Sequence, residues 1–251
     1  MRDIHNRDPE SGRVHDPKAH AQEVQGMFAR IAGVYDFMNH LLSLNLDRLW
    51  RKRLANHVDP DVEVILDLCA GTGDLGLACL KAGRGKQIVA VDFVSEMLRG
   101  LKGKRYADQA WPVTGDGLAI PLPDASVDTV VAGFGVRNLA DPEAGLHEMI
   151  RVVKPGGRML VLEFFKNDPN AAGAAQGPSA LMWWAMKAIV PLLGGLVARD
   201  TAAYSYLPGS MDRFLTVDQY QQLFRRAGCR EVFAERMNFG VAHLVGGRRA
   251  G

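Results

Sequence analysis

Short runs of mostly apolar residues alternate with segments of helical periodicity through the middle of the chain. Four such runs, each of five or six residues, lie at 64–68, 87–91, 127–132 and 158–162. A stretch with apolar residues at helical spacing separates each run from the next. Strands that alternate with helices form a parallel sheet with right-handed crossovers. The pattern therefore predicts a doubly wound α/β domain.

The C-terminal part of the chain has a different pattern, a helix followed by two strands. Thr216 and Gln219 are spaced as in a capping box, which predicts the start of a helix that ends at Gly228. The two strands, at 231–236 and 241–245, are close enough in the sequence to pair as an antiparallel hairpin.

The N-terminal part of the chain shows no strand pattern. Residues 1–25 are polar and are expected to form a disordered, solvated tail. Apolar residues at helical spacing then predict helices over about 27–42 and over 46–58. We therefore predict an N-terminal helical cap, 26–60, within a single domain, 26–251.

The longest apolar stretch of the chain, 181–197, is interrupted by a lysine, a proline and a glycine pair. Its 17 residues fall short of the roughly 20 that a membrane-spanning helix needs. The stretch lies in a predicted insertion, about 166–212, which we expect to form a lid over a substrate. Trp183 and Trp184 favour a bilayer interface, so the lid is expected either to touch a membrane or to pack as ordinary core.

Composition and charge exclude several classes of protein. The chain is 47% hydrophobic and 23% charged, which excludes a disordered protein. Its 30 basic and 28 acidic residues give a net charge of +2, so no partner nucleic acid is expected. Three widely spaced cysteines argue against a disulfide scaffold or a structural zinc site. The polar N-terminus lacks the apolar core of a signal peptide, so we expect a cytoplasmic protein.

A glycine-rich segment follows the first predicted strand. Residues 71–76, G-T-G-D-L-G, fit the pattern G-x-G-x-x-G, in which glycines allow a tight turn and a close approach to a ligand. Asp92 ends the next strand, 19 residues after Gly73, at the position of an acid that binds ribose hydroxyls. These signals predict an adenosine-containing cofactor, either a nicotinamide dinucleotide or S-adenosylmethionine.

The charge beside the glycines separates these two cofactors. A dinucleotide places its pyrophosphate on the helix N-terminus, whereas S-adenosylmethionine carries an ammonium and a sulfonium. Asp67 precedes the glycines and Asp74 follows Gly73. Because carboxylates attract cations and repel a pyrophosphate, the pattern favours S-adenosylmethionine.

Two segments further along the chain add to this signal. Gly115, Asp116 and Gly117 end a further predicted strand between 87–91 and 127–132, where a carboxylate can meet the adenine amino group, and an I-P-L-P-D turn leads into the strand at 127–132. In this order the segments resemble those of class I S-adenosylmethionine-dependent methyltransferases. The resemblance implies a Rossmann-like, mostly parallel seven-stranded sheet with an antiparallel C-terminal hairpin.

Three motifs narrow the resemblance. They are Y-D-F-M-N-H-L-L-S at 35–43 with Trp50 beyond it, F-G-V-R-N at 134–138, and R-V-V-K-P-G-G-R-M-L-V-L-E-F at 151–164. Together they resemble the ubiquinone/menaquinone-biosynthesis C-methyltransferase family over about residues 27–246. The chain departs from the family at Asp47, where the first motif carries a histidine, at Phe165, where the third carries a serine, and at Gly133, which is often serine.

The resemblance assigns residues to the cofactor and the substrate. The cofactor-binding candidates all lie at the ends of predicted strands and are Asp67, Gly71, Thr72, Gly73, Asp92, Asp116, Gly117 and Gly133. The substrate candidates come from the first motif and are Tyr35, Asp36 and Asn39.

The reaction that the resemblance implies is methyl transfer to a ring carbon of a polyprenylated hydroquinol, with demethylmenaquinol, and also a polyprenyl benzoquinol, as expected substrates. The carbon becomes reactive as the neighbouring hydroxyl loses its proton, and a fixed cation stabilises the phenolate. We assign this role to Arg137, with Asn138 as its orienting partner. A structural ion pair is the alternative role for Arg137. Asp36 and His40 are candidate proton acceptors or helix-capping residues, and no metal is required.

Other functions fit the sequence as well. They are a methyltransferase of another small aromatic substrate, an NAD(P)-dependent dehydrogenase, and a non-catalytic partner that retains the cofactor pocket. The expected partners are a polyprenylated quinol and, transiently, the inner face of a membrane. A homodimer or a quinone-biosynthesis assembly is also expected.

Overall fold

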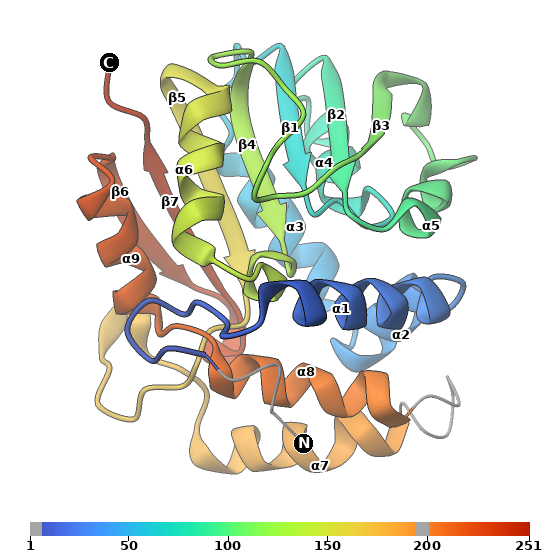
Figure 1. Ribbon diagram of the computed structural model, residues 1–251, viewed down its shortest axis with the longest axis vertical. Helices are drawn as coiled ribbons and strands as arrows, with labels where there is room; N and C mark the ends of the chain where they lie inside the picture. Colours follow the sequence, from blue (N-terminus) through green and yellow to red (C-terminus); the bar gives the residue numbers. More distant parts are fainter. Residues whose placement is uncertain (1–6, 194–200) are drawn as a thin grey trace.

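The computed structural model of the chain describes residues 7–193 and 201–251. In this part of the chain seven strands form one sheet in the order β3-β2-β1-β4-β5-β7-β6 (Figure 1). Their bounds are β1 Val64–Leu68, β2 Gln87–Asp92, β3 Ala110–Thr114, β4 Val127–Gly133, β5 Val153–Glu163, β6 Arg230–Arg236 and β7 His243–Arg248. Strands β1 to β5 pair in parallel, and β7 is antiparallel to both β5 and β6. The predicted sheet, with its antiparallel hairpin, is confirmed.

Two strands, β5 and β7, differ from the predicted bounds by more than one residue. β5 begins five residues earlier than expected, at Val153, because Val153 already pairs with Val127 of β4. β7 begins at His243, two residues later than expected, because a short 3-10 turn over Asn238–Gly240 occupies the connection. The hairpin itself pairs β6 and β7 as predicted.

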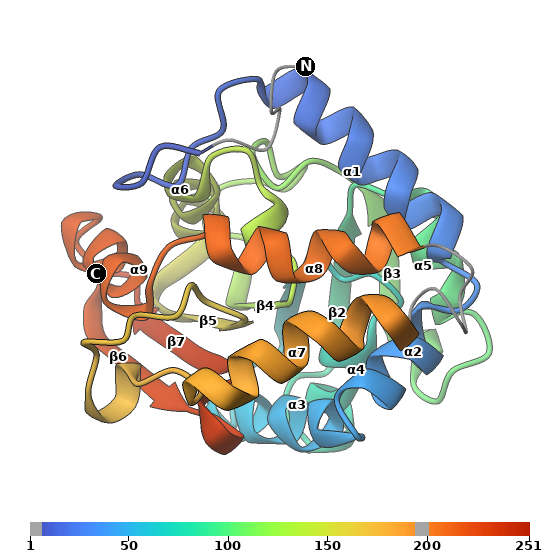
Figure 2. The ribbon, with the colours of Figure 1, turned by 90° about the horizontal axis from the view of Figure 1, so that it is seen from below.

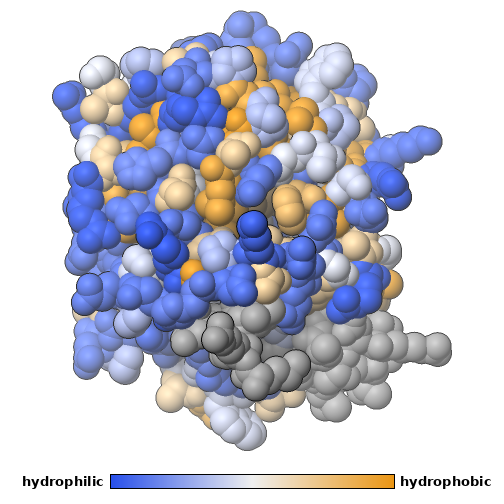
Figure 3. All heavy atoms as spheres, in the orientation of Figure 1, coloured by the Kyte–Doolittle hydropathy of each residue, from blue (hydrophilic) through white to orange (hydrophobic). Residues whose placement is uncertain are grey.

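Helices cover both faces of the sheet. α3 (Leu46–His57) and α4 (Asp74–Lys81) pack on one face, and α6 (Pro142–Val152) and α9 (Val217–Arg226) pack on the other (Figure 1). The short α5 (Ser95–Leu98) lies beside β2 and β3. The predicted capping box at the start of α9 is present. Figure 3 shows that the α6 side of the molecule is mostly polar, with apolar side chains gathered over the middle of the sheet.

The N-terminal segment is folded, so the predicted tail is wrong for residues 7–25. Residues 17–25 form most of α1 (Pro17–Ile31), whose N-cap Asp16 accepts a hydrogen bond from the Ala19 amide. Val14, before the helix, is buried. Residues 1–6 lie outside the described part of the chain. The helix predicted over 27–42 is two helices, α1 and α2 (Tyr35–Leu42).

The predicted insertion contains two helices, α7 (Ala180–Leu193) and α8 (Thr201–Arg213). They lie side by side and, with α1 and α2, form a layer across the carboxyl ends of the parallel strands (Figure 2). Residues 194–200, the end of the apolar stretch, lie outside the described residues. Among the residues described, no helix has the length and apolar character to cross a bilayer.

Candidate cofactor and substrate pockets

A first pocket, here called the cofactor pocket, lies where the carboxyl ends of β1, β2 and β4 face α1. Its volume is about 280 Å³. The ends of β1, β2 and β4 and the loops that follow β1 to β4 supply most of its lining, and one side of α1 and Tyr35 of α2 supply the rest. Five of the eight predicted cofactor residues line this pocket, namely Gly71, Asp92, Asp116, Gly117 and Gly133. The other three, Asp67, Thr72 and Gly73, do not.

The Asp92 carboxylate organises the glycine loop. One oxygen accepts a hydrogen bond from the Gly71 amide at 2.7 Å, and the other accepts one from the Val94 amide at 2.8 Å. Burial raises the pKa of Asp92 above its ordinary value. Gly73 shapes the same loop without lining the pocket. Its φ is +79°, and a Cβ atom there would lie 2.2 Å from a methyl carbon of Leu101, so only glycine fits.

The two acids that flank the glycines lie away from the cofactor pocket. Asp67 is fully buried beneath the loop, where Oδ2 accepts a hydrogen bond from the Gly76 amide at 2.8 Å. Burial raises the pKa of Asp67 to about 8, so this carboxyl is largely neutral at pH 7. Asp74 contacts Lys104 Nζ at 2.7 Å. The sign argument built on Asp67 and Asp74 is therefore wrong, because proximity in sequence does not fix side-chain direction.

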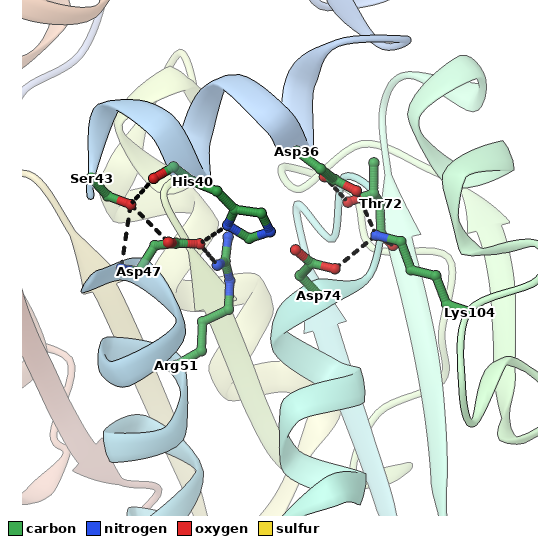
Figure 4. Close-up of polar contacts among 8 residues, drawn as sticks. All are labelled: Asp36, His40, Ser43, Asp47, Arg51, Thr72, Asp74 and Lys104. Carbon is green, nitrogen blue, oxygen red and sulfur yellow. Dashed lines mark hydrogen bonds and ion pairs between the residues drawn. The ribbon is translucent and has the colours of Figure 1, made fainter. Parts of the chain in front are cut away.

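Thr72 and Asp36, assigned to cofactor and substrate, contact each other instead (Figure 4). Thr72 Oγ1 donates to Asp36 Oδ1 at 2.6 Å, and Lys104 Nζ donates to Asp36 Oδ2 at 2.7 Å. With Asp74 these residues form what we call the Lys104 cluster, which connects α2 to the glycine loop. Their side chains line neither pocket.

A second pocket, here called the substrate pocket, lies beside the first. It is about 260 Å³ in volume and is lined mainly by apolar side chains from α1, α2, α3, α7 and α8. Tyr35 and Asn39, two of the predicted substrate residues, line it. Phe28, Tyr35 and Phe134 line both pockets, so these three rings mark the boundary between them.

Arg137 provides a buried cation in the substrate pocket. It is 5% exposed and contacts the fully buried Glu163 at 2.7 Å. Its Nη1 also donates to the carbonyl of Phe134, and its Nε donates to Ser210 Oγ at 3.2 Å. Burial lowers the pKa of Arg137, but the charge and hydrogen bond of Glu163, together with Tyr35 and Tyr206, raise it above its ordinary value. The guanidinium is thus charged, and it forms the ion pair considered as its alternative role.

The backbone beneath the two pockets is strained. Cys69, after β1, and Phe134, after β4, both have left-handed φ values, of +54° and +58°. The loops containing them touch, since a Cβ atom on Gly135 would lie 2.2 Å from Cys69 Cβ. Residues in such conformations cost about 1–3 kcal/mol each and cluster at functional sites. Cys69, Phe134 and Gly135 all line the cofactor pocket, yet the sequence offers no sign of these conformations.

Asn138 links the cofactor pocket to two other parts of the chain. Its side-chain oxygen accepts a hydrogen bond from the Tyr206 hydroxyl of α8 at 3.1 Å, and its carbonyl lies 2.9 Å from His20 Nε2 of α1. Arg7 donates to the carbonyl of Arg137 at 2.7 Å. The supposed tail therefore holds the F-G-V-R-N loop. Asp16 followed by Pro17 is the helix-start signal that could have revealed α1.

Solved structures with this fold define its class. A possible histamine N-methyltransferase from Thermotoga maritima, described as S-adenosylmethionine-dependent, aligns with a TM-score of 0.63 at 17% identity. The match covers 89% of this chain and 98% of that one. The fold is that of the class I S-adenosylmethionine-dependent methyltransferases. Its strand order, with β7 inserted before β6, differs from the 3-2-1-4-5-6 order of dinucleotide-binding domains.

Sequence comparison then identifies the family. Residues 16–248 match the ubiE/COQ5 methyltransferase family. A demethylmenaquinone methyltransferase of Deinococcus radiodurans is 38% identical over 240 residues, 94% of this chain and 97% of the relative. A ubiquinone/menaquinone biosynthesis C-methyltransferase UbiE of Cereibacter sphaeroides is 33% identical over 236 residues, 89% of each chain. The chain belongs to the ubiE/COQ5 methyltransferase family, which confirms the resemblance and gives no support to a dehydrogenase.

Proposed function

We propose that this protein transfers a methyl group from S-adenosylmethionine to a ring carbon of a polyprenylated hydroquinol, with demethylmenaquinol as the principal substrate. The observation that carries the proposal is the pair of adjoining pockets, one lined by acids and the other apolar with a buried cation. The names of the relatives from Deinococcus radiodurans and Cereibacter sphaeroides support the quinol as substrate.

The cofactor pocket suits S-adenosylmethionine. Asp92 and Asp116 offer carboxylate oxygens to hydroxyl and amino groups, and Val94, Met97 and Leu118 offer apolar contact to a purine ring. We assign Gly71, Gly117 and Gly133 to backbone contacts with the cofactor. When bound there, S-adenosylmethionine supplies an electrophilic methyl group. Two carboxylates in one small pocket would repel a pyrophosphate, which disfavours a dinucleotide.

The substrate pocket supplies the charge that the reaction needs. A phenol ionises near pH 10, so forming its anion at pH 7 costs about 4 kcal/mol. A fixed guanidinium in a pocket with little water can offset much of this cost. Arg137 is therefore proposed as the catalytic residue that stabilises the phenolate. Asn138, which lines the cofactor pocket and accepts a hydrogen bond from Tyr206, is proposed as the orienting partner of Arg137. Tyr35 and Asn39 are proposed to contact the substrate from α2.

The position of the candidate proton acceptors argues against both. Asp36 is engaged by Thr72 and Lys104, and His40 contacts Asp47. Neither side chain lines the substrate pocket. We propose that both hold helices in place.

The experiment that tests the function is methyl transfer in solution. Purified protein is incubated with S-adenosylmethionine and a short-chain demethylmenaquinol under anaerobic conditions, and the quinol is analysed by mass spectrometry. The expected product is heavier by one methylene and carries the new methyl on the ring carbon. Binding of S-adenosylhomocysteine, followed by tryptophan fluorescence, shows that the cofactor pocket is intact. Binding without transfer to any quinol would overturn the proposal.

We further propose that the mouth of the substrate pocket rests on a membrane surface. On α7, Leu181 and Trp184 are 75% and 67% exposed, and Met182 between them lines the pocket. Leu44 and Phe239, 80% and 64% exposed, line the same pocket. A prenyl chain gains about 0.8 kcal/mol for each buried CH₂, so it needs an apolar path from the bilayer. The cytoplasmic location on the inner face of a membrane stays a prediction. The formation of a homodimer or of a larger assembly stays a prediction as well.

A further inference from the structure

A second arginine lines the substrate pocket. Arg51 of α3 is 8% exposed and lies in the lining together with Arg137. The Arg51 guanidinium carbon is 5.9 Å from the centroid of the Phe134 ring, and that of Arg137 is 5.7 Å from the Phe164 ring. These two rings stack with their centroids 4.6 Å apart. One apolar pocket therefore presents two cations, each lying against one ring of a stacked pair.

A carboxylate holds Arg51 in this position. Figure 4 shows Asp47 between Arg51, His40 and Ser43. Asp47 Oδ2 accepts a hydrogen bond from Arg51 Nη1 and lies 2.8 Å from His40 Nδ1, while Oδ1 accepts one from Ser43 Oγ at 2.7 Å. Burial raises the pKa of Asp47, but Arg51 and Ser43 lower it below its ordinary value. Asp47, where the family's first motif carries a histidine, thus serves here as the anchor of Arg51.

Arg51 still has hydrogen-bond donors to offer. A guanidinium carries five N–H groups. Within the part of the chain that the structure describes, only Nη1 of Arg51 has a hydrogen-bond partner. Neither Nε nor Nη2 of Arg51 is among the fully buried side-chain nitrogens that lack a partner, so both reach open space beside the pocket. The remaining N–H groups on Nε and Nη2 are therefore available to an oxygen of a molecule in the pocket.

We propose that Arg51 binds the second oxygen of the substrate ring, the one opposite the hydroxyl that Arg137 stabilises. This inference rests on the proposed function and adds the residue that recognises the second of the two para oxygens of a hydroquinol ring. Arg51 comes from α3 and lies against Phe134, whereas Arg137 comes from the loop after β4 and lies against Phe164. Each cation can therefore bind a different oxygen of the ring. Arg51 is a specificity-determining residue, because the ring carbon that receives the methyl group lies beside the other oxygen, the one that loses its proton.

The test compares two rings in the presence of S-adenosylhomocysteine. One is a 2-prenyl-1,4-dihydroxynaphthalene with a short prenyl chain. The other keeps the hydroxyl next to the reacting carbon and lacks the hydroxyl across the ring. Isothermal titration calorimetry under anaerobic conditions gives the dissociation constant of each. We expect the unaltered protein to bind the diol at least tenfold more tightly than the ring with one hydroxyl, which corresponds to about 1.4 kcal/mol of binding free energy.

Arg51→Met is the variant that tests the assignment. In this variant the two dissociation constants should lie within about threefold of each other, mainly because the diol binds more weakly. Arg51→Lys, which keeps a charge but not the forked donor geometry, should restore part of the preference. Arg48→Met carries the same substitution at an exposed position of the same helix and should keep the full preference. Arg51→Met leaves the buried Asp47 without its arginine partner. A second variant, Asp47→Asn combined with Arg51→Met, removes both charges. It too should lose the preference for the diol.

The outcomes separate this inference from the proposed function. An unaltered protein that binds neither ring contradicts the proposed function. An unaltered protein that binds both rings equally, or an Arg51→Met variant that retains the preference, overturns the role of Arg51. If Arg51→Met and the double variant bind both rings more weakly by the same factor, the role of Arg51 is also overturned. That result indicates that Arg51 forms a structural ion pair alone.

Discussion

Arg137 and Glu163 place opposite charges in a buried environment, and their energetics decide how the catalytic proposal can be tested. Removing one partner of a buried ion pair leaves an uncompensated charge and typically costs about 3–5 kcal/mol. A variant that changes only Arg137 would therefore combine a loss of stability with any loss of catalysis. Replacing both residues keeps the interior neutral.

Arg137→Met combined with Glu163→Gln should reduce turnover by about 10²–10³-fold, the usual effect of removing one donor to a developing anion. The dissociation constant of S-adenosylmethionine should stay within about twofold, because Arg137 lines the substrate pocket and not the cofactor pocket. Methyl-transfer kinetics and calorimetry measure the two quantities. Equal losses in both, or turnover close to normal, would leave Arg137 with a structural role only.

Asp67 gives the protein a pH-dependent stability. Burial raises its pKa from 3.8 to about 8 in the folded state. The folded chain therefore keeps a proton that the unfolded chain releases above about pH 4. The stability that this group contributes is complete below pH 4 and is lost as the pH rises towards 8.

Asp67→Asn should remove this dependence, because an amide imitates the protonated carboxyl and can still accept from the Gly76 amide. Relative to the unaltered protein, the free energy of unfolding of the variant should increase between pH 5 and pH 8, by up to about 4 kcal/mol at 1.36 kcal/mol per pH unit. Urea unfolding of both proteins without added ligand, at several pH values, measures the difference. A difference that does not change with pH would contradict the assigned protonation state.

At the scale of secondary-structure elements, α1 and the segment before it complete the site by packing against the cofactor pocket and the loop that carries Arg137. The helix lines the cofactor pocket, and the segment before it reaches the loop that carries Arg137. Arg7 is 9% exposed and donates to the carbonyls of Leu139, at 3.0 Å, and of Arg137. Burial lowers the pKa of Arg7 to about 10, so it stays charged at neutral pH.

Arg7→Ala should lower the free energy of unfolding by about 1–3 kcal/mol, because three buried carbonyl groups, those of Gly12, Arg137 and Leu139, lose their donor. Amide hydrogen exchange in the loop over 137–139 should become faster, which mass spectrometry can follow. Arg13→Ala is the matched control. Arg13 is 59% exposed in its ion pair with Asp141, so its loss should cost no more than about 1 kcal/mol and leave the loop exchange unchanged.

The sequence predicted the strands well and α1 poorly, for a physical reason. Central parallel strands are buried on both faces, so runs such as Val64–Leu68 are apolar except for Asp67. The α9 capping box is equally local. In α1 only four residues are buried, namely His20, Val24, Met27 and Ile31, and their partners lie far away in the sequence. A mostly polar helix of this kind resembles a solvated tail until its distant contacts are known.

The same reason explains which site residues were misplaced. Gly71 and Asp92 line the cofactor pocket, where they were placed because strand ends and glycine turns fix the path of the backbone. Asp36 and Thr72 were assigned to ligands, but they bind each other across 36 positions of sequence. Pairings of this length depend on how α2 packs on the glycine loop. No local pattern contains that information.

At the scale of the whole molecule, several exposed apolar side chains lie at or beside one opening. Leu44 and Phe239 line the substrate pocket, and Leu181 and Trp184 of α7 flank its lining residue Met182. Exposed apolar surface can mark a binding surface for a protein or a membrane. The proposed occupant is a lipid bilayer, because the expected substrate carries a prenyl chain.

Leu181→Ser combined with Trp184→Ser should reduce flotation of the protein with liposomes at least tenfold, since each apolar side chain buried in a membrane contributes about 1.5–3 kcal/mol. Methylation of a water-soluble, short-chain quinol should change little. Trp111→Ser, at a 58% exposed position of the edge strand β3, is the control and should float normally. Unchanged flotation of the α7 variant would count against a membrane contact through this helix.

The position of β7 has a consequence for how the protein is made. β7 comes after β6 in the chain but lies between β5 and β6 in the sheet. On the ribosome, β6 therefore emerges before the strand that joins it to the rest of the sheet exists. A premature stop codon shortly before His243 would remove an interior strand and leave β6 and α9 without their attachment to β5. Nascent chains of this length should be held by chaperones and degraded, although nearly all of the pocket residues have already been translated.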